Sequence, residues 1–291
     1  MIRSDRQRQK WNSEELIGGP APTRTHSAPS DPAEEEASAE EDLAELARVS
    51  RKASASCTFL SRALSDDQVT LGLVSALRSN PPRTGTDLDS FAASLRAAGG
   101  ADDEETLARA SRSVIEDHNA AFAPRRDADG KVDPSDPRHG TVCPIESLNV
   151  GGADADQVRA SVRDAYRQHG FGPDRCRYVP APGTPIDHIC VELAFLASLG
   201  DDCASSVERV LAGENDDDPD EKTHALYDAE SALNDRLVFI EDHLLAWVPQ
   251  FCDQLEAAAS TSFYRGIAQL LRQLVLDETR NLGELDTTAA V

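Results

Sequence analysis

The residues best suited to chemistry lie in the segment PIDHICVELAF, residues 185–195. Asp187 follows a proline and precedes an apolar run, so its carboxylate is well placed to cap the first free amides of a helix. His188 and Glu192 are four residues apart and share one face of that helix. The helix is apolar all round, which indicates burial, and a buried His-Glu pair must be hydrogen-bonded. On these residues alone we favour a structural cap with a satisfied core pair, and a functional site is the alternative.

Metal ligands are the next candidates, because Asp-His dipeptides occur at 117–118, 187–188 and 242–243. A metal-dependent hydrolase could use such side chains, and we keep it as an alternative function. The order is the reverse of the His-Asp ligand pair of the metal-dependent phosphohydrolases. A di-iron bundle needs two Glu-x-x-His motifs, and only Glu221 with His224 has that spacing.

A calcium loop is also suggested by residues 125–136, where acidic residues and a glycine occupy several of the expected positions. Position 1 is Arg125, however, and position 12 is Asp136 instead of a bidentate glutamate. Pro134 and Pro137 also block the exiting helix. We therefore expect a polar turn and predict no metal site.

Motifs typical of enzymes are missing from the sequence. It contains no phosphate loop, dinucleotide fingerprint, zinc-protease motif or nucleophile elbow. The six cysteines include no C-x-x-C pair, so we expect isolated buried thiols. The sequence predicts no catalytic residues, no cofactor and no enzymatic activity.

The charge is strongly negative, with 52 Asp and Glu against 29 Lys and Arg, a formal net charge of −23. Nucleic-acid binding needs the opposite balance, so it is excluded as a general function. Only four of the cations are lysines. Such a surface repels itself unless salt screens it, and the Debye length falls to about 3 Å at 1 M salt. The composition is typical of a protein from a high-salt, halophilic cytoplasm.

The elements that position these residues are all predicted to be helices, since apolar residues recur with the helical period and no strand alternation occurs. Expected helices cover residues 40–64, 69–77, 88–98, 102–123, 156–169, 186–199 and 223–248, with a last one opened by Ser260 as N-cap. Pro249 is expected to end the helix before it. In that helix we expect Trp247 to belong to the core.

The organisation follows from composition: the fold class is all-α, a single-domain helical bundle with a disordered acidic N-terminal tail. Residues 1–41 form the tail, because they carry too little apolar surface to offset ordering. Residues 42–280 form the helical domain with loops at 124–154 and 213–222, and residues 281–291 form a C-terminal tail. No apolar run can span a bilayer and no signal or lipidation motif occurs, so we expect a cytoplasmic protein.

The motif PIDHICVELAF resembles, position by position, one on a central helix of the TorD/DmsD family of chaperones that mature molybdenum-cofactor oxidoreductases. Weaker matches keep the family's order around it: residues 118–122, Pro144 to Ser147, then Phe239, His243 and Trp247. The likeness covers roughly residues 45–278. His118 and Ile145 depart from it, because the family has aromatic residues there.

The resemblance implies an all-helical chaperone, monomer or dimer, that binds the twin-arginine signal peptide and the apo-form of a reductase such as dimethyl sulfoxide reductase. It would assist cofactor insertion and hold the client back from export. The implied client-binding residues are Pro185, Asp187, His188 and Glu192. An anionic cap and a titratable histidine could receive an Arg-Arg pair beside apolar walls. A nitrate-reductase assembly chaperone, from a related family with another client, is the alternative.

Overall fold

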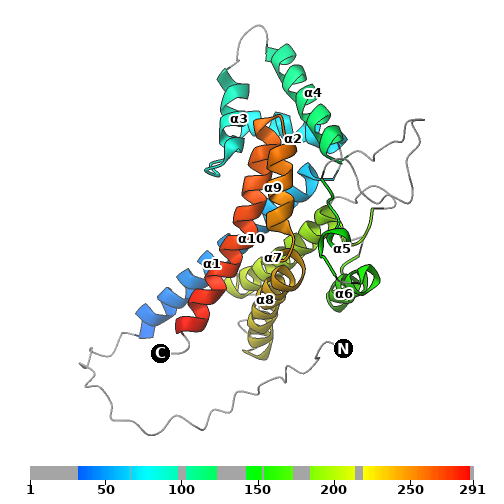
Figure 1. Ribbon diagram of the computed structural model, residues 1–291. Coiled ribbons are helices and arrows are strands. Elements are labelled where there is room, and N and C mark those ends of the chain that lie inside the picture. The colour runs from blue at the N-terminus through cyan, green and yellow to red at the C-terminus, as the bar shows by residue number, and fades with distance from the viewer. Residues whose placement is uncertain are drawn as a thin grey trace. The chain divides into compact units, whose positions relative to one another are not determined.

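The computed structural model describes residues 32–65, 67–97, 103–122, 142–152, 154–172, 184–213 and 219–288 (Figure 1). Every regular element in these residues is a helix, and Ile145 and His188 form an isolated antiparallel β-bridge. The all-α prediction is confirmed for this part of the chain. The chain divides into two compact units, Met1–Glu41 and Asp42–Val291.

The helices follow one another in the order α1 Pro32–Ala63, α2 Asp67–Ser79, α3 Asp87–Ala97, α4 Asp103–Phe122, α5 Glu146–Asn149, α6 Ala155–Gln168, α7 Ile189–Leu211, α8 Pro219–Phe239, a π-helix Ile240–Leu244, α9 Val248–Ala258 and α10 Ser262–Thr288. Within the second unit, α9 lies beside α10, and α7 packs along α8 (Figure 1).

Both chain ends differ from the expected boundaries. Residues 1–31 of the predicted tail lie outside the described residues, but residues 32–41 belong to α1. This stretch is rich in alanine and glutamate, which favour helix, and acidic residues suit a helix N-terminus. At the other end α10 continues to Thr288, so residues 281–288 are helical and not part of a tail.

Helix α7 begins at Ile189 and runs to Leu211, instead of ending at Leu199 as predicted. Gly200, Asp201 and Asp202, which follow the predicted end, have low helix propensity. The apolar stripe continues beyond them with Cys203 and Val207, which are buried in a small core cluster with residues of α1 and α8. Gly200 allows α1 to pack closely here, since a Cβ would lie 3.1 Å from the Ser50 carbonyl oxygen of α1.

The predicted helix 223–248 is interrupted. Helix α8 ends at Phe239, a π-helical turn follows, and the Leu245 amide donates to the Ile240 carbonyl oxygen at 2.9 Å. Pro249 does not end this helix but lies in the first turn of α9, where the missing N–H costs no helix bond. The π-turn keeps Leu244 and Trp247 in the core, and Trp247 is buried as predicted.

Helix α10 is fixed at its start by α4. Asp117 accepts hydrogen bonds from the Ser260 amide and the Thr261 amide, both at 2.8 Å, and also from both hydroxyl groups. The helix begins at Ser262, so the expected N-cap role of Ser260 is wrong. Further along, Gly266 lets α3 approach so closely that a Cβ would lie 2.3 Å from the Leu88 nitrogen.

Among the described residues, no helix combines the length and apolarity needed to cross a membrane.

Candidate functional site

The predicted functional motif lies against a second segment, residues 143–149, which we call the strap. The Glu146 amide donates to the Asp187 carbonyl oxygen at 2.9 Å, and the Ile189 amide donates to the Pro144 carbonyl oxygen at 2.9 Å. These bonds hold the strap antiparallel to the start of α7. The strap falls inside the loop predicted for 124–154, of which residues 124–141 and 153 lie outside the described residues, yet it contains the short helix α5.

His188, and not Asp187, caps α7. The Cys190 amide donates to His188 Nδ1 at 3.2 Å, one of the donors at the start of the helix that lack an intrahelical acceptor. Asp187 has no exposed surface, and its Oδ2 accepts from the Ser147 amide at 3.1 Å. Among the described residues, its Oδ1 has no hydrogen-bond partner. The prediction that Asp187 caps the helix is wrong, because its carboxylate points toward the strap and accepts from the Ser147 amide.

The expected His188–Glu192 pair does not form. Four groups instead meet in the core: Glu146 of the strap, Asp187, Glu192 of α7 and His243 of the π-turn, which we call the acid cluster. His243 Nδ1 lies 3.1 Å from Glu146 Oε1 and 3.2 Å from Oε2, and its Nε2 lies 3.4 Å from Ser161 Oγ. His243 therefore pairs with Glu146, which holds the strap to the π-turn.

Glu192 is fully buried, and neither of its carboxyl oxygens accepts a hydrogen bond from a donor group within the part of the chain that the structure describes. In its protonated form it can donate a hydrogen bond to the neighbouring Glu146 carboxylate. Burial raises the pKa of Glu192 well above that of an ordinary glutamate, and the neighbouring Glu146 and Asp187 add to this effect. Glu192 therefore keeps its proton more readily than an exposed glutamate does.

The four predicted client-binding residues differ in their access to solvent. Pro185 and His188 are partly exposed, whereas Asp187 and Glu192 are completely covered. Neither covered residue can touch a bound peptide in this conformation. Both instead support the surface that Pro185 and His188 present.

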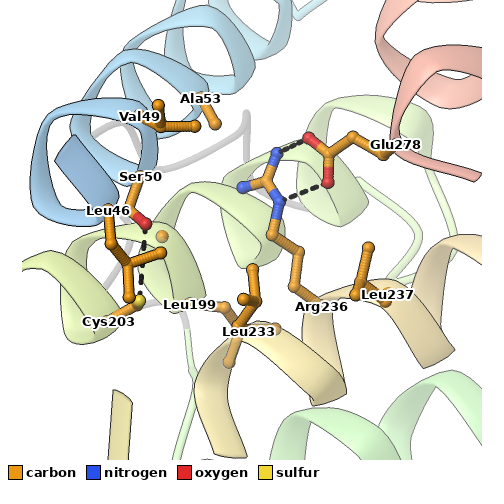
Figure 2. Close-up of a pocket in the computed structure, with 11 residues that line it drawn as sticks. Leu46, Val49, Ser50, Ala53, Leu199, Cys203, Leu233, Arg236, Leu237 and Glu278 are labelled. Atoms are coloured by element: carbon orange, nitrogen blue, oxygen red, sulfur yellow. Dashed lines mark hydrogen bonds and ion pairs between the residues drawn. The ribbon is translucent and has the colours of Figure 1, made fainter. Parts of the chain in front are cut away.

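An apolar pocket of about 240 Å³ lies between α1, α7, α8 and α10 (Figure 2). It is lined by Leu46, Val49, Ser50, Ala53, Leu199, Gly200, Cys203, Leu233, Arg236, Leu237 and Glu278. In Figure 2, Arg236 points toward Glu278. Its Nε donates to the Glu278 carboxylate at 2.8 Å, its Nη2 donates to the same group, and its Nη1 donates to the Leu196 carbonyl oxygen at 2.8 Å. The charge is thus paired, and the remaining walls suit an apolar ligand.

A second, polar pocket of similar size borders the acid cluster. It lies between α6, α8 and the π-turn, and its lining includes Asp164, Asp235, Asp242, His169 and His243. His169 Nε2 lies 3.5 Å from an oxygen of Asp235. This polar pocket gives solvent a route to the ring of His243.

The structure gives the three Asp-His pairs separate roles. Asp117 holds the two residues that precede α10, Asp187 and His188 lie at the start of α7, and Asp242 is exposed beside the buried His243. Over the described part of the chain, no group of three or more His, Cys, Asp or Glu side chains could hold a metal ion. The calcium-like loop at 125–136 lies outside that part.

Comparison with known families gives a match to the nitrate reductase delta subunit family over residues 135–253, less than half of the chain. These residues are similar to the NarJ/TorD-type chaperone family. The search of curated proteins and the search of solved structures found no match. The NarJ/TorD-type part of the chain contains the strap, all of α7 and the whole acid cluster.

The sequence motifs located this site without showing how it is assembled. Glu146 was singled out only as part of a weak family match, and His243 as part of another such match and of the Asp-His dipeptide 242–243. They are 97 residues apart, and no periodicity connects them. The sequence predicted that one face of α1 is apolar, but not that this face lines a pocket.

Proposed function

We propose that this protein is an assembly chaperone that binds the twin-arginine signal peptide of a molybdenum-cofactor oxidoreductase in the cytoplasm. It would hold the apo-enzyme back from export while the cofactor is inserted. The observation that supports this most is the NarJ/TorD-type match, because it covers the residues that form the strap, α7 and the acid cluster. A family of chaperones also favours binding over catalysis.

The signal peptide would contact the partly exposed residues of the motif. Pro185 and His188 meet the arginine-bearing end of the peptide, and Asp187 and Glu192 position them from below. The apolar pocket between α1, α7, α8 and α10 takes the apolar run of the signal, since its walls are mainly leucine, valine and alanine side chains. Val49, which is 47% exposed, forms part of its rim.

Nitrate reductase is the second candidate client. The family that matches residues 135–253 carries the name of a nitrate reductase subunit, which favours a nitrate-reductase assembly chaperone over one for dimethyl sulfoxide reductase. The two proposals share a binding mode and differ in the peptide bound.

Titration of a fluorescently labelled twin-arginine peptide in molar KCl tests the proposal. His188→Ala and Val49→Asp should each weaken binding about tenfold, which corresponds to roughly 1.4 kcal/mol. Matched controls are His224→Ala and Leu211→Asp, because both residues are exposed and neither lines the apolar pocket. Equal affinity for all four folded variants would refute the assigned surface.

The peptide itself supplies the second comparison. A twin-lysine peptide should bind more weakly, because lysine lacks the planar bidentate donors of arginine. Signal peptides from a nitrate reductase and from a dimethyl sulfoxide reductase, titrated side by side, identify the preferred client. If none of these peptides binds, the function proposed here is wrong.

A further inference from the structure

The acid cluster contains more acids than its surroundings can neutralise. Glu146 comes from the strap, Asp187 and Glu192 from the start of α7, and His243 from the π-turn; all four are at least nine-tenths buried. His243 can carry a positive charge when it is protonated, and its Nδ1 lies 3.1 Å from Glu146 Oε1. Two further carboxyl groups therefore share the core without a cation of their own.

The elements packed around the cluster bring further charged groups: Asp164, Asp235 and Asp242 line the polar pocket beside His243, and Arg159 lies beside the strap. Arg159 of α6 donates through Nη1 to Ser147 Oγ at 3.1 Å and through Nη2 to Asp156 at 2.6 Å. Its charge is thus engaged at the surface and separated from Glu192 by the strap. From α1, the group that reaches this region is the uncharged Ser61, which donates to the Cys190 carbonyl oxygen.

Burial without hydrogen bonds is costly for an ionised carboxylate and much less so for a neutral acid. An ionised Glu192 would be in this situation, because no donor group among the described residues meets either of its oxygens, and the same holds for Oδ1 of Asp187. A protonated Glu192 can instead donate to the Glu146 carboxylate. Loss of the proton from Glu192 would place like charges next to one another where little water can screen them. The contact nearest to this repulsion is the one between the strap and the start of α7.

We infer that Glu192 is a proton-dependent latch: while it is protonated the strap stays closed on α7, and when it loses its proton the strap separates and disorders the Pro185–His188 surface. This regulation rests on the proposed function only where it concerns client binding. The polar pocket beside His243 supplies the path by which solvent reaches the cluster.

The direction of the pH effect follows from the raised pKa of Glu192. Between the ordinary glutamate range and that raised value, the folded protein keeps a proton that the unfolded chain has lost. Stability from this group is complete at low pH and decreases as pH rises through that window. Glu192→Gln imitates the neutral acid, so it should fold and lack this decrease.

The test compares urea unfolding of the full chain, wild type and Glu192→Gln, from pH 5 to 9 in molar KCl. The unfolding constant of the wild type should rise about tenfold or more relative to the variant, the equivalent of one pKa unit. Glu241→Gln is the matched control, since Glu241 is exposed on the same π-turn as His243. Parallel pH profiles for wild type and Glu192→Gln would overturn the latch.

Two measurements on the wild type keep the inference testable if a variant misfolds. Infrared spectroscopy should detect a protonated carboxyl at neutral pH, and a spectrum without one refutes the latch. Hydrogen exchange should show the Glu146 and Ile189 amides losing about tenfold of their protection as pH rises, beyond the change in intrinsic rate. None of these measurements needs a client peptide. If no peptide binds, the proposed function is therefore disproved while the latch can still be confirmed or refuted.

Discussion

Buried polar groups in this molecule are of two kinds. Asp117 and Arg236 have several hydrogen-bond partners each and connect helices that are distant in sequence. Asp187 and Glu192 retain oxygens without a partner among the described residues. The first kind stabilises the fold, whereas the second kind costs stability and is typical of sites under another constraint.

Asp187 provides a test at the level of one residue. Asp187→Ala leaves the buried Ser147 amide without its acceptor and should cost about 1–3 kcal/mol of unfolding free energy. Asp187→Asn keeps an acceptor oxygen for that amide and should cost less. Urea denaturation in molar KCl measures both, and equal losses would show that the Ser147 contact is not what matters.

Trp247 provides another, because it is one of the largest fully buried side chains and its indole N–H has no partner among the described residues. Trp247→Ala should cost about 3–5 kcal/mol through the cavity it leaves. Trp247→Phe keeps most of the ring and removes the unsatisfied N–H, so the loss should be much smaller. Chemical denaturation compares the two, and an unchanged midpoint for Trp247→Ala would place the ring outside the core.

Helix contacts in the fold depend on small residues at defined positions. Gly266 of α10 touches the backbone of α3 at Leu88, and Gly200 of α7 touches α1 at Ser50. Both are helical glycines, which normally weaken a helix by about 1 kcal/mol relative to alanine. Close packing between helices compensates for that weakness.

Two glycine-to-alanine substitutions distinguish the effect of close helix packing from the effect of helix propensity. Gly266→Ala should destabilise the protein by about 1–3 kcal/mol, since α3 must move to accommodate the methyl group. Gly72→Ala on α2 meets nothing closer than 4.0 Å and should stabilise by about 0.4–1 kcal/mol. Thermal unfolding of both variants is the measurement, and stabilisation by Gly266→Ala would mean that α3 is not packed here.

Helix prediction from the sequence succeeded where one apolar stripe had clear ends. The expected helix 102–123 is observed as Asp103–Phe122, because its apolar residues follow one period and its ends are marked by polar or proline residues. The prediction failed at Gly200, because the low helix propensity of glycine is outweighed by burial of α7 against α1. It also failed at the π-turn, because apolar residues recur there with the helical period although the backbone is not a regular α-helix. For the site, the motif predicted the place but not the partners, since the contact between Glu146 and His243 depends on tertiary packing.

The whole molecule carries a net charge of −23, and many of its arginines are already engaged. Arg51 pairs with Asp201 and Glu208, and Arg272 pairs with Asp253 and Glu256. Surface pairs of this kind contribute little each, so repulsion among the remaining acids dominates at low salt.

Stability should therefore increase with KCl from about 0.1 M to molar concentration, as the Debye length shortens to about 3 Å. Circular dichroism during thermal unfolding measures this. A triple variant, Glu104→Gln, Glu230→Gln and Glu241→Gln, removes three exposed acids and should show a weaker dependence on salt. A wild type that is fully folded and equally stable at low salt would disprove the high-salt interpretation.

The π-turn that follows α8 determines the direction in which its side chains point, including His243, which contacts Glu146. A π-turn accommodates one residue more than the α-helical turn it replaces, and each residue of an α-helix rotates the side-chain direction by about 100°. Deleting one residue from 240–242 would remove the extra residue of this turn and rotate the His243 side chain by about 100°. His243 would then point away from Glu146. The number of residues in this turn therefore matters for the contact between His243 and Glu146. Insertions or deletions of one residue here should be tolerated far less than substitutions.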